Sequence, residues 1–420
     1  MIRRLPAALL SLFIATGTWA ANSTCQFEQV PAGPQKLGPW IDKSNWLDIE
    51  NQRLTLQAGE VFMPAWRLAP TGDGQRTTVK LRPIDDFPVV DPLDGSRRDL
   101  AFLLDSRLYA DGLVVLRNGR VVTERYRNGL TPDKPRLLLE ATRPLLNLLG
   151  AISVSQGKLA ADKSVSRFLP NMPPSAGLRK LSIRRLLESK ERHAWTPEDL
   201  ESWQQAGGWT TNQAGNGIHA WLSQAGRWEK PLDEPETTSF AATPDDDLLA
   251  RVLAESNATP LAQLFCERLL SRHPPEYPVI WLSDSQGVEL ATGLGLSLRD
   301  FAKLGQVLVD ARSSRNRGKI PAWFIETLTA SSGMRSAEIK GLAKGSEQRY
   351  GFVHLGGSPN RVALIGAHGT SLYIDFDERL VIALYATRPG ESTPATLAVL
   401  ERAWKAIDLA IARPEKLKKP

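Results

Sequence analysis

Two groups of strand-like segments, separated by a long helical block, constrain the fold of this chain most. Residues 112–117 and 120–126 are rich in β-formers and are joined by Asn118-Gly119, a pair typical of tight hairpins. Further strand-like runs occur near the C-terminus, at 350–355, 361–365, 371–376 and 380–386. The clearest helical segments between the two groups are 181–188, 245–256, 260–271 and 297–311. A helical block inserted between two halves of an antiparallel sheet predicts an α+β fold.

Two further helices complete this arrangement. Residues 137–154 are largely apolar and predict a buried helix, with Gly157 suited to its end. Residues 394–412 predict a closing amphipathic helix, because apolar side chains recur along one face. We therefore expect a main domain at 105–412, with a mostly helical subdomain at about 160–330.

The N-terminal segment has the order of features found in a secretory signal peptide. A basic pair, Arg3-Arg4, is followed by an apolar stretch and then by a small-residue cleavage site at Thr18-Trp19-Ala20. The apolar stretch is shorter than the roughly 20 residues that span a bilayer. The sequence therefore predicts a signal peptide at 1–20, a periplasmic or secreted protein, and no membrane span.

The segments next to the main domain differ in character. Residues 21–104 are rich in proline, glycine and tryptophan and contain short alternating runs such as 53–56, which predict a strand-and-loop extension wrapped on the main domain. Residues 413–420 form a basic tail. The two cysteines, Cys25 and Cys266, exclude a disulfide-rich scaffold. An oxidising compartment would allow one bridge between them, and the sequence leaves open whether they meet.

Composition and charge exclude several classes of function. The chain is 42% hydrophobic and 23% charged, as in an ordinary globular protein. Loss of Arg3 and Arg4 with the signal peptide lowers the net charge from +6 by two, to +4, so a nucleic-acid partner is not predicted. The five histidines are scattered, without the paired spacing of zinc ligands. No phosphate-binding loop or dinucleotide fingerprint occurs, and we expect no metal and no cofactor.

Seven short segments, in order along the chain, together resemble one known family. They are residues 111–119, 124–133, 150–159, 168–170, 181–187, 297–306 and 366–375. Over about residues 105–410 the chain resembles the serine β-lactamase and penicillin-binding-protein family, in the branch of 6-aminohexanoate-dimer hydrolase and class C-like esterases. The resemblance implies a β-lactamase/transpeptidase-like fold, in which helices flank an antiparallel sheet and a mostly helical subdomain is inserted.

The resemblance also implies where a catalytic site would lie. In that family a Ser-x-x-Lys motif opens the central helix; the serine is the nucleophile, the lysine takes its proton, and a backbone N–H pair holds the oxyanion. Here Glu140 stands at the serine position and Arg143 at the lysine position. Arginine is a poor base because it stays charged at any ordinary pH. The familiar nucleophile and base are therefore predicted to be absent.

Of the family's two other motifs, one is missing from this chain and one is partly kept. A tyrosine that assists catalysis should lie near Ala242, but no tyrosine occurs between Tyr126 and Tyr277. The third motif is partly kept, because His368-Gly369-Thr370 is similar to the family's Lys/His-x-Gly strand and its oxyanion role uses backbone atoms. The resemblance thus implies a vestigial site with no intact catalytic residue, made of Glu140, Arg143, Ala242, His368, Gly369 and Thr370.

Other nucleophiles have little support. The only Ser-x-x-Lys, Ser155 to Lys158, begins fifteen residues beyond Glu140, or ~22 Å along a helix. Gly157 ends that helix, so the serine and the lysine would not share a face. No Gly-x-Ser-x-Gly elbow is present. A Ser-His-Asp triad assembled from distant segments stays open.

Several charged and aromatic residues have two interpretations. Glu140 and Arg143 have the spacing at which opposite charges meet on a helix; we favour a pair that fills the former pocket over one that binds a charged ligand. The Asp245-Asp246-Asp247 run is predicted to be a solvated helix N-terminus. Residues 203–228 are predicted to form a long ordered loop, whose tryptophans pack in the core more readily than they line a cleft. His368 is likewise expected to be a packed residue.

These observations support three hypotheses about function. The leading one is a periplasmic pseudo-hydrolase that binds a small-molecule or peptidoglycan-derived ligand, or a partner protein. The alternative is an active hydrolase of the same fold that acts on an ester, an amide or a β-lactam through non-standard residues. A structural or assembly protein that uses the N-terminal extension is the third.

Overall fold

The computed structural model describes residues 25–70, 81–189, 192–211, 216–233, 240–313, 318–331 and 337–412. The predicted signal peptide and the basic tail lie outside these residues. Within them the chain forms two antiparallel sheets, one of seven strands and one of five, together with three small two-stranded sheets. The predicted mixture of helices and antiparallel strands is confirmed.

The larger sheet joins both ends of the main domain. Its hairpin, β7 (Ala110–Arg117) and β8 (Arg120–Tyr126), matches the predicted strands. Strand β7 also pairs with β18 (Leu380–Ala386), which brings the start and the end of the domain together. The sheet continues from β18 through β17 (Ser371–Asp375), β16 (Arg361–Ile365), β15 (Phe352–His354) and β14 (Glu347–Arg349).

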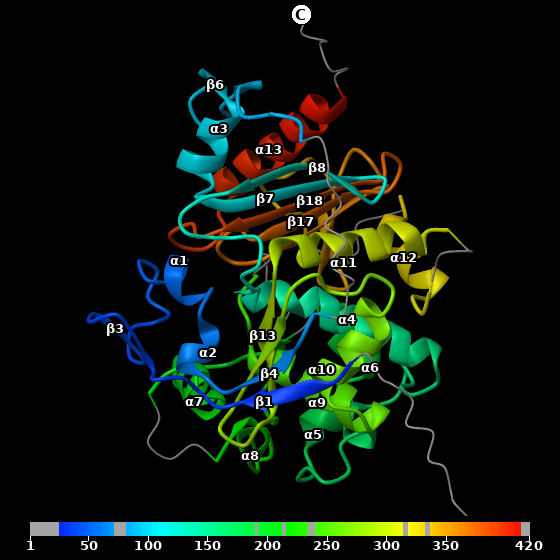
Figure 1. The fold of residues 1–420 in the computed structure, drawn as a ribbon. Coiled ribbons are helices and arrows are strands. Elements are labelled where there is room, and N and C mark those ends of the chain that lie inside the picture. The colour runs from blue at the N-terminus through cyan, green and yellow to red at the C-terminus, as the bar shows by residue number, and fades with distance from the viewer. Residues whose placement is uncertain are drawn as a thin grey trace, which may run out of the picture.

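Helices cover both faces of the seven-stranded sheet (Figure 1). On one face lie the closing helix α13 (Pro394–Ala412) and the short helix α3 (Leu100–Phe102), which continues into the π-helical turn η1 (Leu103–Arg107). On the other face lies α11 (Leu298–Ala311), where Phe301 stacks on Tyr385 of β18. Next to α3, β5 (Pro88–Val90) pairs with β6 (Arg97–Asp99).

The five-stranded sheet was not predicted. It contains β12 (Val279–Ser283) and β13 (Glu289–Leu296), although residues 160–330 were expected to be mostly helices and loops. Glycines at 293 and 295 lower the strand propensity of β13, but Gly293 is required there. A Cβ at this position would lie 2.6 Å from the carbonyl oxygen of Leu282 on the neighbouring strand.

The N-terminal extension supplies two of the other strands of this sheet, and the third lies just before the central helix. The order is β1 (Phe27–Val30), β4 (Ala65–Leu68), β12, β13 and β9 (Arg136–Leu137). Between β1 and β4 lie the hairpin β2 (Lys36–Leu37) and β3 (Ile41–Asp42), then α1 (Gln52–Thr55) and α2 (Gly59–Phe62). The strand-like interpretation of 53–56 is wrong, because residues 52–55 form one helical turn.

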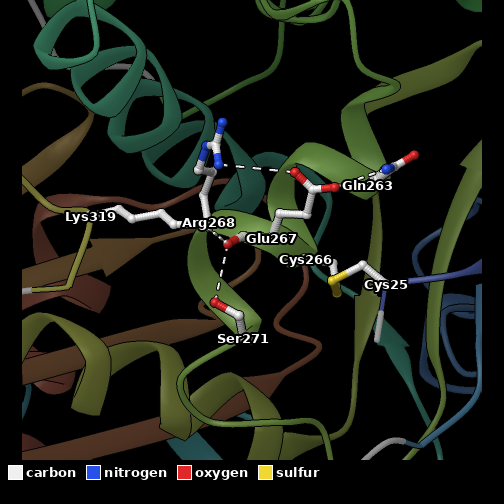
Figure 2. Close-up of a disulfide and its surroundings, with 7 residues drawn as sticks. All are labelled: Cys25, Gln263, Cys266, Glu267, Arg268, Ser271 and Lys319. Atoms are coloured by element: carbon white, nitrogen blue, oxygen red, sulfur yellow. Dashed lines mark hydrogen bonds and ion pairs between the residues drawn. A yellow bond between two sulfur atoms is a disulfide. The ribbon is translucent and has the colours of Figure 1, made fainter. Parts of the chain in front are cut away.

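A disulfide fixes the start of the extension. Cys25 is bonded to Cys266, with a Cα–Cα distance of 5.7 Å, and this answers the question that the sequence left open. Figure 2 shows that Cys266 comes from the helical block, where the carbonyl of the adjacent Glu267 accepts hydrogen bonds from Ser271 and Lys319. Because the bond joins residues 241 apart, it ties the extension to the body of the molecule.

The helical block carries the predicted helices and four α-helices that were not predicted, α5 (Ala176–Lys180), α7 (Pro197–Gly207), α8 (Ile218–Leu222) and α12 (Ala322–Thr329). Residues 203–228 are not one long loop, because they include the end of α7 and all of α8. Thr196 and Asp199 form a capping box at the start of α7, and this sequence pattern is typical of a helix N-terminus. The remaining elements are η3 (Val165–Arg167), α6 (Ile183–Glu188), β10 (Arg192–His193), β11 (Leu232–Asp233), α9 (Pro244–Asn257), α10 (Leu261–Phe265) and η4 (Cys266–Leu270).

The central helix begins later than predicted. Helix α4 spans Arg143–Ser155, and the 3-10 turn η2 (Leu139–Thr142) precedes it in place of a continuous helix from residue 137. Leu139 has φ +49°, a left-handed conformation that costs a branched residue free energy. The break turns the chain between β9 and α4 and places Glu140 at the junction.

Candidate active site

Three of the predicted site residues, Glu140, Ala242 and His368, line one cavity of about 350 Å³. They come from η2, from the segment before α9 and from the turn between β16 and β17. The N-terminal extension and helix α7 close the cavity. The other described lining residues are Leu47, Gln52, Leu139, Leu200, Trp203, Gln204, Trp209, Ala241 and Thr292.

The Glu140 carboxylate lies on a pair of backbone donors. It accepts hydrogen bonds from its own N–H and from the N–H of Ala367, in the turn next to His368. Burial raises the pKa of this carboxyl to about 7, against the effect of the two donors, and the negative charges of Asp246 and Glu391 raise it further. The cavity therefore contains a carboxyl whose pKa is well above the ordinary value for glutamate.

Arg143 does not line the cavity, and its side chain pairs with Asp246 on helix α9. Its guanidinium Nε lies 3.0 Å from Oδ1 of Asp246 on α9, and both side chains are buried. Within the described residues there is no ion pair or hydrogen bond between Glu140 and Arg143. The predicted local pairing is therefore wrong, because η2 and α4 are not one continuous helix and the buried Asp246 carboxylate takes the cation.

The three aspartates that open α9 are buried, and the prediction of a solvated helix end is wrong. Asp245 lies 2.6 Å from both His193 Nδ1 and Trp195 Nε1. Asp247 accepts hydrogen bonds of 2.7 Å from Trp203 Nε1 and from the Ala291 N–H. Burial raises the pKa of Asp247 to about 7. In the described part of the chain, no group of His, Cys, Asp or Glu has an arrangement that could hold a metal ion.

Comparison with known proteins identifies the family. A family model described as Beta-lactamase matches residues 104–403. The chain belongs to the Beta-lactamase family. A 6-aminohexanoate-dimer hydrolase from Paenarthrobacter ureafaciens is 21% identical over 361 residues, 80% of this chain and 90% of that protein. The predicted family resemblance is confirmed.

Solved structures of this Beta-lactamase-like fold superpose on the chain. One, assigned provisionally as a 6-aminohexanoate-dimer hydrolase from Bacillus anthracis, has a TM-score of 0.72 at 20% identity and covers 88% of this chain and 96% of its own. The octameric penicillin-binding protein homologue from Pyrococcus abyssi has a TM-score of 0.52 at 16% identity, covering 76% and 77%. At these identities the likeness establishes the fold, and the predicted β-lactamase/transpeptidase-like architecture is confirmed. None of the helices described here is long and apolar enough to traverse a lipid bilayer.

Residues 368–370, which were predicted to correspond to the family's third motif, lie in the turn between β16 and β17. His368 Nδ1 lies 3.2 Å from the carbonyl oxygen of Arg388, which can only accept, and burial lowers the pKa of the imidazole. His368 is partly buried and lines the cavity. Gly369 has φ +89°, a turn conformation that favours glycine. Thr370 lies behind this turn, where its carbonyl accepts from the Gly366 N–H.

Several cavity residues escaped prediction. Trp203 and Trp209 line the cavity, whereas Trp221 and Trp228 pack around Trp195. The spacing of the tryptophans does not separate these two pairs. Gln52 and Leu47 come from the extension outside the matched family segment, and no motif marked them.

The Ser-x-x-Lys motif and a larger cavity lie outside the candidate site. Ser155 ends α4, is exposed and does not line the cavity, as expected of a Ser-x-x-Lys beyond the helix. A larger cavity of about 440 Å³ contains Lys43, whose pKa burial lowers to about 8. None of the predicted site residues lines that cavity, so the smaller cavity with Glu140 is the candidate site.

Proposed function

We propose that this protein is an exported member of the Beta-lactamase family that binds a ligand in the Glu140 cavity without forming an acyl-enzyme. The observation that carries the proposal is the Glu140 carboxylate on the N–H groups of Glu140 and Ala367. In acyl transfer such a pair must be open to receive the negative oxygen of a tetrahedral intermediate. Here an acidic side chain of the protein already fills it.

Arg143 supports the same proposal. A serine hydrolase of this family needs a base beside the nucleophile that releases and accepts a proton. Arg143 stays charged at ordinary pH, and its charge faces Asp246. If the Glu140 carboxylate attacked an acyl carbon and expelled the leaving group, the product would be a mixed anhydride, in place of the ester that a serine nucleophile forms. The ligand of such a protein would be a small molecule or a peptidoglycan-derived fragment, held without covalent attachment.

One observation favours a second candidate, an active hydrolase with Glu140 as general base. A carboxyl with a pKa of about 7 in a cavity is suited to take a proton from water at neutral pH. The Paenarthrobacter relative is described as a hydrolase. Against this candidate, the same carboxylate would have to leave the N–H pair before that pair could hold an oxyanion.

Covalent labelling and turnover separate the two candidates. The mature protein is incubated with a fluorophosphonate and with a fluorescent penicillin, and intact mass is measured beside an active serine β-lactamase as positive control. We expect no mass shift, and no hydrolysis of nitrophenyl esters above the Glu140→Gln background. A stoichiometric adduct on any serine would refute the non-acylating proposal. Ester turnover that is lost in Glu140→Gln would establish the hydrolase instead.

Export is a separate part of the proposal. The N-terminal features predict cleavage after Ala20, and the Cys25–Cys266 bond suits an oxidising compartment. Expression of the full chain in a Gram-negative host, followed by fractionation and N-terminal sequencing, tests it. We expect a periplasmic protein that begins at Ala21; an uncleaved protein confined to the cytoplasm would contradict export.

A further inference from the structure

The larger cavity, of about 440 Å³, lies between the N-terminal extension and the helical block. Its walls come from the extension, from the end of α7 with the residues that follow it, and from the end of β12. Phe62, Met63 and Pro64 give it an apolar side. Cavities of this size, mainly apolar with a few polar groups, are typical of sites for small organic molecules.

Lys43 is the only lysine or arginine among the described lining residues of this cavity. Its side chain is partly exposed, and its Nζ donates to the carbonyl of Phe62, another lining residue, at 3.1 Å. The same Nζ lies 5.1 Å from the centre of the Trp46 ring. Within the described part of the chain the amine makes no ion pair and no second hydrogen bond. It therefore has hydrogens left for water or for a ligand.

The one carboxyl among the described lining residues, Asp284, is occupied by backbone donors. Its Oδ2 accepts from the Ile218 N–H at 2.7 Å, and its Oδ1 accepts from the N–H groups of Gln286 and Val288 at 2.8 and 2.9 Å. Burial, with no neighbouring charge to offset it, lowers the pKa of Lys43 to about 8. Near neutral pH a larger fraction of this amine is therefore unprotonated than in an exposed lysine.

We propose that the Lys43 amine is a nucleophile that binds a small, uncharged carbonyl compound in this cavity as an imine. The nitrogen lone pair attacks the carbonyl carbon, and the carbonyl oxygen gains a proton to give a carbinolamine. That adduct then loses water, so the two amine hydrogens leave with the carbonyl oxygen and a C=N bond forms, without oxidation or reduction. Lysines in desolvated, apolar surroundings are suited to this step. The inference goes beyond the proposed function and does not involve Glu140.

A site for a small anion is the alternative use of a lone lysine. Anion sites usually combine several charged or backbone donors, whereas this cavity offers one amine that has no counter-ion. Burial also disfavours the charged amine that an anion needs, and the face of the Trp46 ring offsets only part of that cost. The hydroxyls of Thr211 and Ser285, both exposed lining residues, can donate to a carbonyl or carbinolamine oxygen without adding charge. The cavity therefore favours a neutral carbonyl compound.

Benzaldehyde in the presence of cyanoborohydride tests the proposal, because the reductant traps an imine as a stable secondary amine. The folded, disulfide-bonded protein is incubated at pH 7.5, and modification of each lysine is followed by intact mass and peptide mapping. We expect Lys43 to react about tenfold or more faster than the exposed Lys36 of β2. Its rate should level off as the benzaldehyde concentration rises, because the cavity fills. A Lys43 that reacts no faster than Lys36, or without saturation, would overturn the proposal.

Two matched variants and a charged probe locate the reaction. Lys43→Met removes the amine and should abolish the saturable modification, whereas Lys36→Met removes an amine from the same extension and should leave it unchanged. Thermal unfolding shows whether both variants stay folded. Benzoate resembles benzaldehyde in shape but is charged and forms no imine, so in the wild-type protein it should not protect Lys43. Protection of Lys43 by benzoate, with no modification by benzaldehyde, would make the cavity an anion site and refute the inference.

Discussion

Two carboxyls, Glu140 and Asp247, share a pKa of about 7, and burial is the main cause in both. Each accepts two hydrogen bonds, and Asp246 raises the pKa of each. They differ in what they face. Glu140 is partly exposed and lines the candidate cavity, whereas Asp247 is 3% exposed and each of its oxygens has a donor, Trp203 or Ala291.

The difference shows that a raised pKa is not sufficient by itself to identify a functional group. Both structural networks and active sites perturb titration. Asp247 borders a separate cavity of about 240 Å³, but its oxygens are used to hold the Trp203 indole and strand β13. We infer that Asp247 positions the wall of the site, while Glu140 is the carboxyl that meets a ligand.

The largest loss of stability is expected when Asp246, whose charge acts on both Glu140 and Asp247, loses its partner Arg143. Arg143→Met removes the partner of a buried carboxylate and should lower the free energy of unfolding by about 3 kcal/mol. It should also raise the pKa of Glu140 and Asp247 further, because the charge of Asp246 is no longer offset. Urea unfolding at pH 7 measures the loss. The double variant Arg143→Met/Asp246→Asn should recover most of it; a single variant as stable as the wild type would mean that the pair is not buried.

The second prediction contrasts the two carboxyls directly. Asp247→Ala leaves the Trp203 indole and the Ala291 N–H without an acceptor and should cost about 2 kcal/mol. Glu140→Ala should cost less than about 1 kcal/mol, because its backbone donors open to the cavity and can meet water. Both are measured by urea unfolding, with Asp247→Asn as the isosteric control. Equal losses in the free energy of unfolding for the two alanine variants would refute the inference that Asp247 supports the cavity wall while Glu140 faces a ligand.

The sequence predicted the larger sheet better than the second one, and the reason is local. The hairpin at Asn118-Gly119 and the C-terminal strands have turn residues and alternation that need no distant partner. Strand β13 pairs closely with β12 through its glycines, and glycine lowers the expectation of a strand until the neighbour is known. Strand β4 of the extension joins the same sheet by pairing with β12, so its place depends on residues that are distant in the sequence.

The structure brings three of the predicted site residues to one cavity, but the predicted pairing of Glu140 with Arg143 is wrong. Glu140, Ala242 and His368 meet at one cavity, as the family resemblance implied. Arg143 pairs with Asp246, which lies 103 positions away, in place of the residue three positions away. The left-handed backbone of Leu139 also precedes the late start of α4, and nothing in a leucine predicts that conformation. The assignment of Glu140 to the nucleophile position itself stays a prediction.

The smallest predicted effect is a change in how stability depends on pH. It is the most specific, because that slope reports the difference in bound protons between the unfolded and native states. A carboxyl whose pKa is raised by folding holds its proton more tightly in the native state, so stability is greatest below the unfolded pKa and falls as the pH rises through the folded value. For Glu140 this window runs from 4.5 to about 7. From pH 6 to pH 7 the wild type should lose about 1 kcal/mol more than Glu140→Gln. Asp247 titrates in the same range in both proteins, so its contribution cancels in the difference. Urea unfolding at closely spaced pH values measures both slopes; if they are parallel, Glu140 is already ionised at pH 6, and its likeness to Asp247 disappears.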